Sequence, residues 1–162
     1  FYKEIFLIFI GLKLVIMTNI ILPVDFGKTT DVLLGAAIKF AKEVNGRLCL
    51  IHVAPMDLGL AVGDIGMQYF PEIEQSEIRE ELLELNRLEQ QVVAQGVDCE
   101  HLLKQGIPKD IILAYAEQKN AGYIVMGSHG RSGIYDVFIG SLTKELTKLS
   151  PIPVLVVPCH EK

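Results

Sequence analysis

The chain lacks the excess of basic residues that is typical of proteins that bind nucleic acids nonspecifically. It contains 15 Lys and Arg residues against 20 Asp and Glu residues, which gives a formal net charge of −5. The acidic residues are concentrated, because residues 72–100 contain nine acids and only two bases. We therefore expect no nucleic-acid partner, although the mildly basic residues 101–162 could meet an anionic small molecule.

Cysteine is also scarce, with three residues, an odd count, and no paired spacing. This pattern excludes a disulfide framework and is typical of reduced thiols in a cytoplasmic protein. Cys49 and His52 form a C-x-x-H pair, but an odd offset places their side chains on opposite faces of a strand. We therefore expect no metal site there.

The composition lacks the features of a disordered chain, which needs low hydrophobicity and high net charge. Half of the 162 residues are apolar, 22% are charged, and the mean hydropathy is +0.35. A chain of this length fits one domain with a substantial hydrophobic core.

Residues 1–16 stand apart, because twelve of them are apolar and the first methionine is Met17. The segment is shorter than the roughly 20 apolar residues of a membrane-spanning helix, and no small-residue cleavage site of a signal peptide follows it. We expect an N-terminal extension before a domain that covers residues 17–162. An extra packed element and a membrane anchor are the alternatives, and a membrane partner is not expected.

Residues 17–162 alternate between strand-like and helix-like segments. Nearly continuous apolar runs predict strands at 19–24, 47–54, 122–126 and 152–157. Residues 97–104 are predicted to form a further strand. Apolar residues at the helical period predict helices at 30–45, 74–95, 109–119 and 140–149, the first stopped by Gly46 and the second with a solvated acidic face. Residues 55–71 predict a long loop. Strict alternation indicates an α/β domain with a single five-stranded parallel sheet and helices on both faces.

Glycines cluster directly after the fourth predicted strand. Gly127, Gly130 and Gly133 let the backbone approach a ligand closely. A helix is predicted to begin near Gly140 and Ser141, with free N–H groups and the positive end of its dipole. The two groups of amides would suit a phosphate chain. A glycine-rich turn that binds no ligand is the alternative interpretation.

Two well-known nucleotide motifs are missing. Gly27-Lys28-Thr29 is similar to the end of a phosphate-binding P-loop, but Leu22 stands where that motif requires its upstream glycine. No G-x-G-x-x-G sequence opens a helix, so a dinucleotide site of the Rossmann type is not supported.

The spacing Gly127-x2-Gly130-x9-Gly140-Ser141 resembles the ATP-binding motif of the universal stress proteins, G-x2-G-x9-G-[S/T]. The resemblance covers residues 17–158 and is specific, because several ordered motifs accompany one long fixed spacing. It leaves residues 1–16 outside, in agreement with an extension. The other matching segments are Ile21-Leu22-Pro23-Val24-Asp25-Phe26, His52-Val53, Gly106-Ile107-Pro108 and Pro153-Val154-Leu155-Val156-Val157.

The resemblance implies a Rossmann-like sheet with strand order 3-2-1-4-5, similar to that of the adenine-nucleotide α-hydrolases. The first and fourth strands would then be neighbours at a switch point, where open α/β sheets bind ligands. The resemblance also implies ATP as the ligand, with Mg²⁺ or Mn²⁺ as a candidate companion of the nucleotide. It further implies a homodimer formed through the strand from Ile152 to Val157.

The resemblance also implies roles for individual residues. In ATP-binding members of the family, the counterpart of Asp25 contacts ribose and adenine, and the counterpart of Gly127 contacts ribose. One departure is Gly27, where the family often has a serine, and Thr29 or Thr30 would supply the missing hydroxyl. The complete set of residues expected at the nucleotide is Pro23, Val24, Asp25, Val53, Met126, Gly127, His129, Gly130, Arg131, Gly140, Ser141, Leu142 and Thr143.

No carboxylate pair, nucleophile–base dyad or metal cluster is visible in the sequence, so no catalytic residue is assigned. The resemblance therefore implies a cytoplasmic stress-response regulator that holds ATP and is at most a slow ATPase. A nucleotide-free dimeric stress protein with a chaperone-like or interaction role is the alternative. An adenylating enzyme of the α-hydrolase type is disfavoured, because residues 25–29 do not resemble its S-G-G-x-D-S-like loop.

Overall fold

A computed structural model of the chain describes residues 17–56, 60–63, 66–69, 71–128 and 139–159. The expected N-terminal extension, residues 1–16, lies outside these ranges. No helix within them is both long and apolar enough to cross a membrane.

Five parallel strands form the main sheet, in the order β5-β2-β1-β6-β7. Counted among these five, this is the order 3-2-1-4-5, so the predicted topology is confirmed. The central strand β1 pairs with β2 along its whole length and with β6 at Ile20–Tyr123 and Ile21–Ile124. The strand bounds are β1 Thr18–Pro23, β2 Gly46–Ala54, β5 Cys99–Gln105, β6 Tyr123–Gly127 and β7 Val154–Val157.

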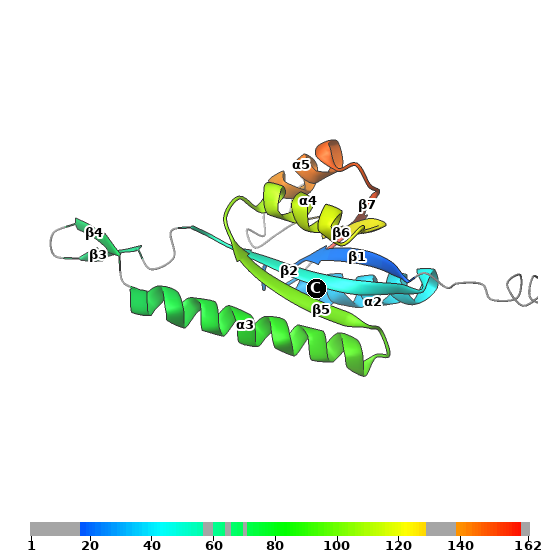
Figure 1. Cartoon of the computed structure of the whole chain (residues 1–162), viewed down its shortest axis with the longest axis horizontal. Coiled ribbons are helices and arrows are strands. Elements are labelled where there is room, and N and C mark those ends of the chain that lie inside the picture. The colour runs from blue at the N-terminus through cyan, green and yellow to red at the C-terminus, as the bar shows by residue number, and fades with distance from the viewer. Residues whose placement is uncertain (1–16, 57–59, 64–65, 70, 129–138, 160–162) are drawn as a thin grey trace, which may run out of the picture.

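Helices cover both faces of the sheet (Figure 1). Successive residues of a strand point to opposite faces. Ile20 and Leu22 of β1 accordingly pack with α2 and α3, whereas Ile21 packs with α4 and α5. This double coverage explains why the strands read as continuous apolar runs. The helix bounds are α2 Thr30–Val44, α3 Pro71–Ala94, α4 Pro108–Gln118 and α5 Ser141–Leu149.

Helix α2 is not ended by the glycine that the sequence suggests. Asn45 takes the left-handed conformation after the helix, with a φ of 51°. Gly46 already belongs to β2, where an added Cβ would lie 2.5 Å from Ile20 Cδ1. This glycine is therefore required by the close packing between the starts of β1 and β2.

The prediction of a continuous loop at residues 55–71 is wrong. The segment contains an antiparallel hairpin, β3 Leu60–Gly63 and β4 Gly66–Tyr69, in which Gly63 pairs with Gly66. Glycine is typical of loops, but two glycines that face each other also permit a tight reversal between strands. Helix α3 then begins at Pro71, since proline suits the first position of a helix. The hairpin stands away from the main sheet (Figure 1).

The three cysteines are unpaired and buried, which confirms that they form no disulfide framework. Burial raises the pKa of the Cys49 thiol to about 12, and the nearby Glu100 carboxylate adds to this shift. Burial also raises the pKa of the Cys99 thiol to about 12, with a smaller contribution from Glu89. Burial likewise raises the pKa of Cys159. The thiols therefore behave as small apolar core groups.

Two leucines of α3 test how this helix packs on the sheet. Leu85 is fully buried, whereas Leu83 is 63% exposed. Leu85→Ala should lower the free energy of unfolding by about 2–5 kcal/mol, because it leaves a cavity in the core. Leu83→Ala should change it by less than about 0.5 kcal/mol. Urea unfolding followed by circular dichroism measures both variants, and equal losses would contradict this packing.

Candidate functional site

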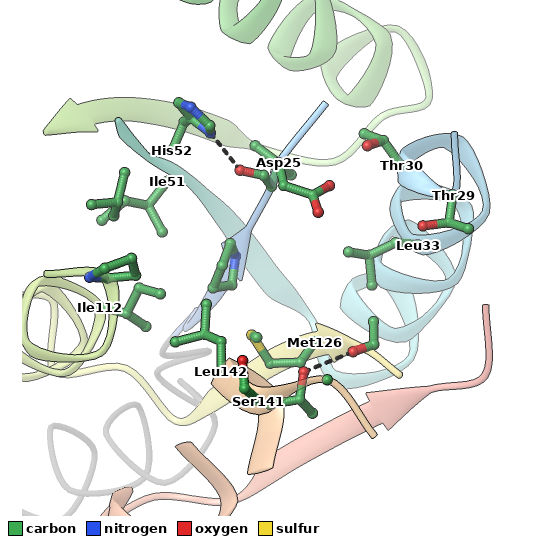
Figure 2. Close-up of a pocket in the computed structure, with 17 residues that line it drawn as sticks. Asp25, Thr29, Thr30, Leu33, Ile51, His52, Ile112, Met126, Ser141 and Leu142 are labelled. Atoms are coloured by element: carbon green, nitrogen blue, oxygen red, sulfur yellow. Dashed lines mark hydrogen bonds between the residues drawn. The ribbon is translucent and has the colours of Figure 1, made fainter. Parts of the chain in front are cut away.

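A pocket of about 280 Å³ opens where β1 and β6 end side by side. The chain leaves β1 toward α2 on one face, and it reaches α5 on the other face after β6. Because α2 and α5 lie on opposite faces, a crevice is left at the carboxyl edge of the sheet. Figure 2 shows this pocket with Asp25, Thr30 and His52 on one side and Ser141 and Leu142 on another.

All the predicted site residues that the structure describes line this pocket, although they come from four separate segments. They are Pro23, Val24, Asp25, Val53, Met126, Gly127, Gly140, Ser141, Leu142 and Thr143. The remaining three predicted residues, His129, Gly130 and Arg131, lie outside the described ranges.

A short turn places Asp25 at the wall of the pocket. The Gly27 N–H donates a hydrogen bond of 3.1 Å to Asp25 Oδ1, which orients the carboxylate. Phe26 between them has a φ of 56°, a left-handed conformation that costs about 1–2 kcal/mol. Its ring centroid lies 4.3 Å from that of His52. This contact helps to offset the strain of the turn.

His52 holds the end of β1 from the neighbouring strand. Its Nδ1 lies 2.7 Å from the carbonyl oxygen of Val24, and because a carbonyl only accepts, Nδ1 carries the proton and donates. Its Nε2 lies 3.3 Å from Glu81 Oε1 of α3. Cys49 packs on the opposite face with α4 and α5, so the predicted separation of Cys49 and His52 is confirmed.

The acidic face of α3 is not wholly solvated, contrary to the expectation from sequence. Glu81 is mostly buried beside His52, and Glu89 contacts His101 of β5. The helix lies along β2 and β5, so one row of its polar residues meets the strands.

A second hollow next to the pocket is lined by Asp25, His52, Val53, Pro55, Glu77, Glu80 and Glu81. Within the described ranges, no three His, Cys, Asp or Glu residues are grouped to hold a metal ion.

Ser128 joins the two ends of the glycine-rich segment. Its carbonyl accepts a hydrogen bond of 2.8 Å from the Gly140 N–H, and its own N–H donates to the carbonyl of Val157 at 2.8 Å. Its hydroxyl accepts from the Cys159 N–H at 3.0 Å. These bonds connect β6, β7 and the start of α5. The last residue of β6 and the first residue of α5 are thereby held at the same pocket.

The first turn of α5 contributes both backbone and side-chain groups. Gly140 is the N-cap and Ser141 the first helical residue, so N–H groups of this turn lack partners inside the helix. Thr143 is 4% exposed, and its hydroxyl donates a hydrogen bond of 2.9 Å to the Gly127 carbonyl. Thr143 therefore positions the end of β6, a role that the sequence motif does not reveal.

Several residues of the pocket wall were not assigned from sequence. Leu33 of α2, Ile51 of β2 and Ile112 of α4 add apolar surface, and Thr29, Thr30, His52 and Pro108 also line the wall. The sequence indicates Thr29 and Thr30 only as replacements for a missing serine. The apolar residues carry no local signal, because the periodicity that marks a core position is the same for a pocket wall.

Comparison with known proteins agrees with this geometry. A model of the universal stress protein family matches residues 17–158. The chain belongs to that family. Universal stress protein YxiE of Bacillus subtilis is 30% identical in an alignment of 144 residues that covers 86% of this chain and 97% of YxiE. Universal stress protein MJ0577 of Methanocaldococcus jannaschii is 27% identical and covers 88% of this chain and 96% of its own length.

Solved structures of family members share the fold. The structure of MJ0577 superposes with a TM-score of 0.69, at 25% identity, and covers 90% of this chain and 98% of its own. A universal stress protein in complex with cAMP has a TM-score of 0.62, at 21% identity, and covers 88% of this chain and 97% of its own. One from Archaeoglobus fulgidus in complex with dAMP has the same TM-score, at 19% identity, and covers 87% and 98%.

Two threonines of α5 test the positioning role of Thr143. Thr143→Val should lower the free energy of unfolding by about 1–3 kcal/mol, because the Gly127 carbonyl loses its buried donor. Thr147 is exposed and bonds only within its own helix, so Thr147→Val should cost less than about 0.5 kcal/mol. Thr143→Ser keeps the hydroxyl and should recover much of the loss. Thermal unfolding of the three variants decides, and equal effects of both valine variants would contradict the role.

Proposed function

We propose that this protein binds ATP in the pocket between β1 and β6 and acts as a stress-response regulator in the cytoplasm. One observation carries the proposal. Residues that the family motif marks for nucleotide contact converge on a single pocket from four segments of the chain. Such a pocket at the switch point of an open α/β sheet is where ligands of this fold class bind.

The chemistry of the pocket suits the three parts of a nucleotide. Val53 and Met126 offer apolar side chains for the adenine ring. The carboxylate of Asp25 can accept hydrogen bonds from ribose hydroxyls. Gly140 and Ser141 begin α5, whose free N–H groups and positive dipole end favour phosphate oxygens. No Walker lysine is needed for such a phosphate site.

The bound molecules of related structures support an adenine nucleotide as the ligand class. Family members with the same fold are found in complex with cAMP and with dAMP. The intact spacing Gly127-x2-Gly130-x9-Gly140-Ser141 favours ATP within this class, because it supplies amides for a longer phosphate chain.

The pocket offers few groups that could catalyse the hydrolysis of ATP. Among the described residues, His52 is the histidine that lines the pocket; its Nδ1 donates to the Val24 carbonyl, and its Nε2 faces Glu81 Oε1 at 3.3 Å. The described residues form no metal cluster, so Mg²⁺ or Mn²⁺ would be held mainly by the phosphates of the nucleotide. We therefore propose slow hydrolysis or none.

We also propose a homodimer through β7, the edge strand of the sheet. The carbonyls of Pro153 and Val157 accept hydrogen bonds from Ile124 and Ser128 on the β6 side. Backbone groups alternate along a strand, so those of Val154 and Val156 point to the free edge. Leu155 is 39% exposed there. Antiparallel pairing with a second copy would satisfy these groups and cover the apolar edge.

Removal of one carboxylate tests nucleotide binding. Asp25→Asn keeps an oxygen that can accept the hydrogen bond from the Gly27 N–H. It loses the negative charge that would strengthen hydrogen bonds from the ribose hydroxyls. ATP affinity should fall about 10-fold or more, as expected for a hydrogen bond to a charged group. Asp98→Asn, at an exposed pair with Arg47, is the control and should bind as the wild type does. Isothermal titration calorimetry measures all three proteins. No heat with millimolar ATP and Mg²⁺ for the wild type would favour the nucleotide-free alternative.

A single proline tests the dimer. Val156→Pro removes an N–H that points away from β6, so it should block pairing between copies while leaving the sheet folded. Val156→Thr keeps the N–H and is the control. Light scattering at tens of micromolar should report dimers for the wild type and the threonine variant, and monomers for the proline variant. A monomeric wild type or a dimeric proline variant would refute this interface.

A further inference from the structure

The hydroxyl of Thr30 is a buried polar group with no hydrogen-bond partner among the described residues. Thr30 is the first residue of α2 and only 7% exposed. Its backbone is satisfied, because the Thr30 N–H donates to the Gly27 carbonyl at 3.0 Å. The side-chain oxygen alone is left without a bond.

The helix itself does not explain this hydroxyl. The N-cap position belongs to Thr29, and no side-chain hydrogen bond caps the helix. A threonine in the first helical position lies too far along the chain to act as the N-cap. A buried hydroxyl without a partner destabilises the fold, because it loses its bonds to water and gains none in return. A valine would fill the same space without that penalty.

The position of Thr30 indicates where a partner would come from. Thr30 lines the same pocket as Asp25, and Figure 2 shows both residues beside the space between the end of β1 and the start of α2. Threonine in a helix populates two rotamers, so Oγ1 can change its direction by rotation about one bond. A ligand in the pocket is therefore the natural partner of this hydroxyl.

Charge decides which part of a nucleotide lies at this end of the pocket. The Asp25 carboxylate would repel a phosphate group placed next to it. The start of α5, which favours anions, forms a separate part of the wall (Figure 2). The apolar side chains of Ile51 and Ile112 suit the base better than a sugar. Ribose is the remaining part, and its neutral hydroxyls match a carboxylate acceptor beside a threonine hydroxyl.

We propose that Thr30 is a ribose-binding residue whose Oγ1 forms a hydrogen bond with a hydroxyl of the bound nucleotide. This inference rests on the proposed binding of ATP. The hydrogen bond would make the site selective for ribonucleotides with an intact diol, because loss of the contacted hydroxyl leaves Thr30 Oγ1 buried without a partner.

The test compares three variants with three nucleotides. Thr30→Val removes the hydroxyl at constant shape, Thr30→Ser keeps it, and Thr147→Val removes an exposed hydroxyl of α5 that does not line the pocket, as a control. Calorimetry measures the affinities for ATP, 2′-deoxy-ATP and 3′-deoxy-ATP. For ATP, we expect Thr30→Val to bind about 5- to 10-fold more weakly than the wild type, as for one lost hydrogen bond. Thr30→Ser and Thr147→Val should bind nearly as the wild type does.

The deoxynucleotides identify the contact. With the analogue that lacks the contacted hydroxyl, wild type and Thr30→Val should bind alike. An equal loss in Thr30→Val with all three nucleotides, or no loss with any, would overturn the ribose contact while ATP binding stands. Wild-type protein that binds no ATP would overturn both this inference and the proposed function.

Melting temperatures without nucleotide give an independent readout. Since the hydroxyl has no partner among the described residues, Thr30→Val should melt at the same temperature as the wild type or higher. A structural hydroxyl would instead make this variant melt several degrees lower, and that result would overturn the inference.

Discussion

The pairing between β1 and β6 is the constraint on which the other functional features depend. These strands share only the pairs Ile20–Tyr123 and Ile21–Ile124, whereas β1 continues beside β2 as far as Pro23. At its own carboxyl end, β6 continues beside β7, where Gly127 pairs with Val157. The sheet therefore divides between β1 and β6 while remaining intact on both sides. The pocket lies at this division.

Each side of the division is held by one buried side chain from elsewhere in the fold. His52 of β2 donates to the Val24 carbonyl beyond β1, and Thr143 of α5 donates to the Gly127 carbonyl of β6. Val24 lies beyond the last pair of β1 with β2, and Gly127 lies beyond the last pair of β6 with β1, so both carbonyls lie outside these regular strand pairings. Loss of either donor would cost free energy, because a buried carbonyl would lack a partner. The edges of the pocket are consequently held in place by contacts within the protein itself.

The sequence predicted the sheet well because parallel, doubly covered strands give long apolar runs that differ clearly from amphipathic helices. It failed at the β3–β4 hairpin, since a short segment that contains glycines has too little periodicity to separate a strand from a loop. The candidate site was predicted through the glycine spacing, which is local in the chain. The roles of His52, Glu81 and Thr30 could not be predicted, because each depends on a contact or a missing contact between distant segments.

The burial of the three thiols has a consequence for the chemistry of the protein under oxidising conditions. Peroxides react with thiolates, and exposed thiolates react fastest. Cys49 and Cys99 have pKa values of about 12, so almost no thiolate is present near neutral pH. Cys159, which lies next to the Ser128 junction, is buried as well. The fold can thus keep its shape during oxidant exposure, because none of its three thiols is readily oxidised.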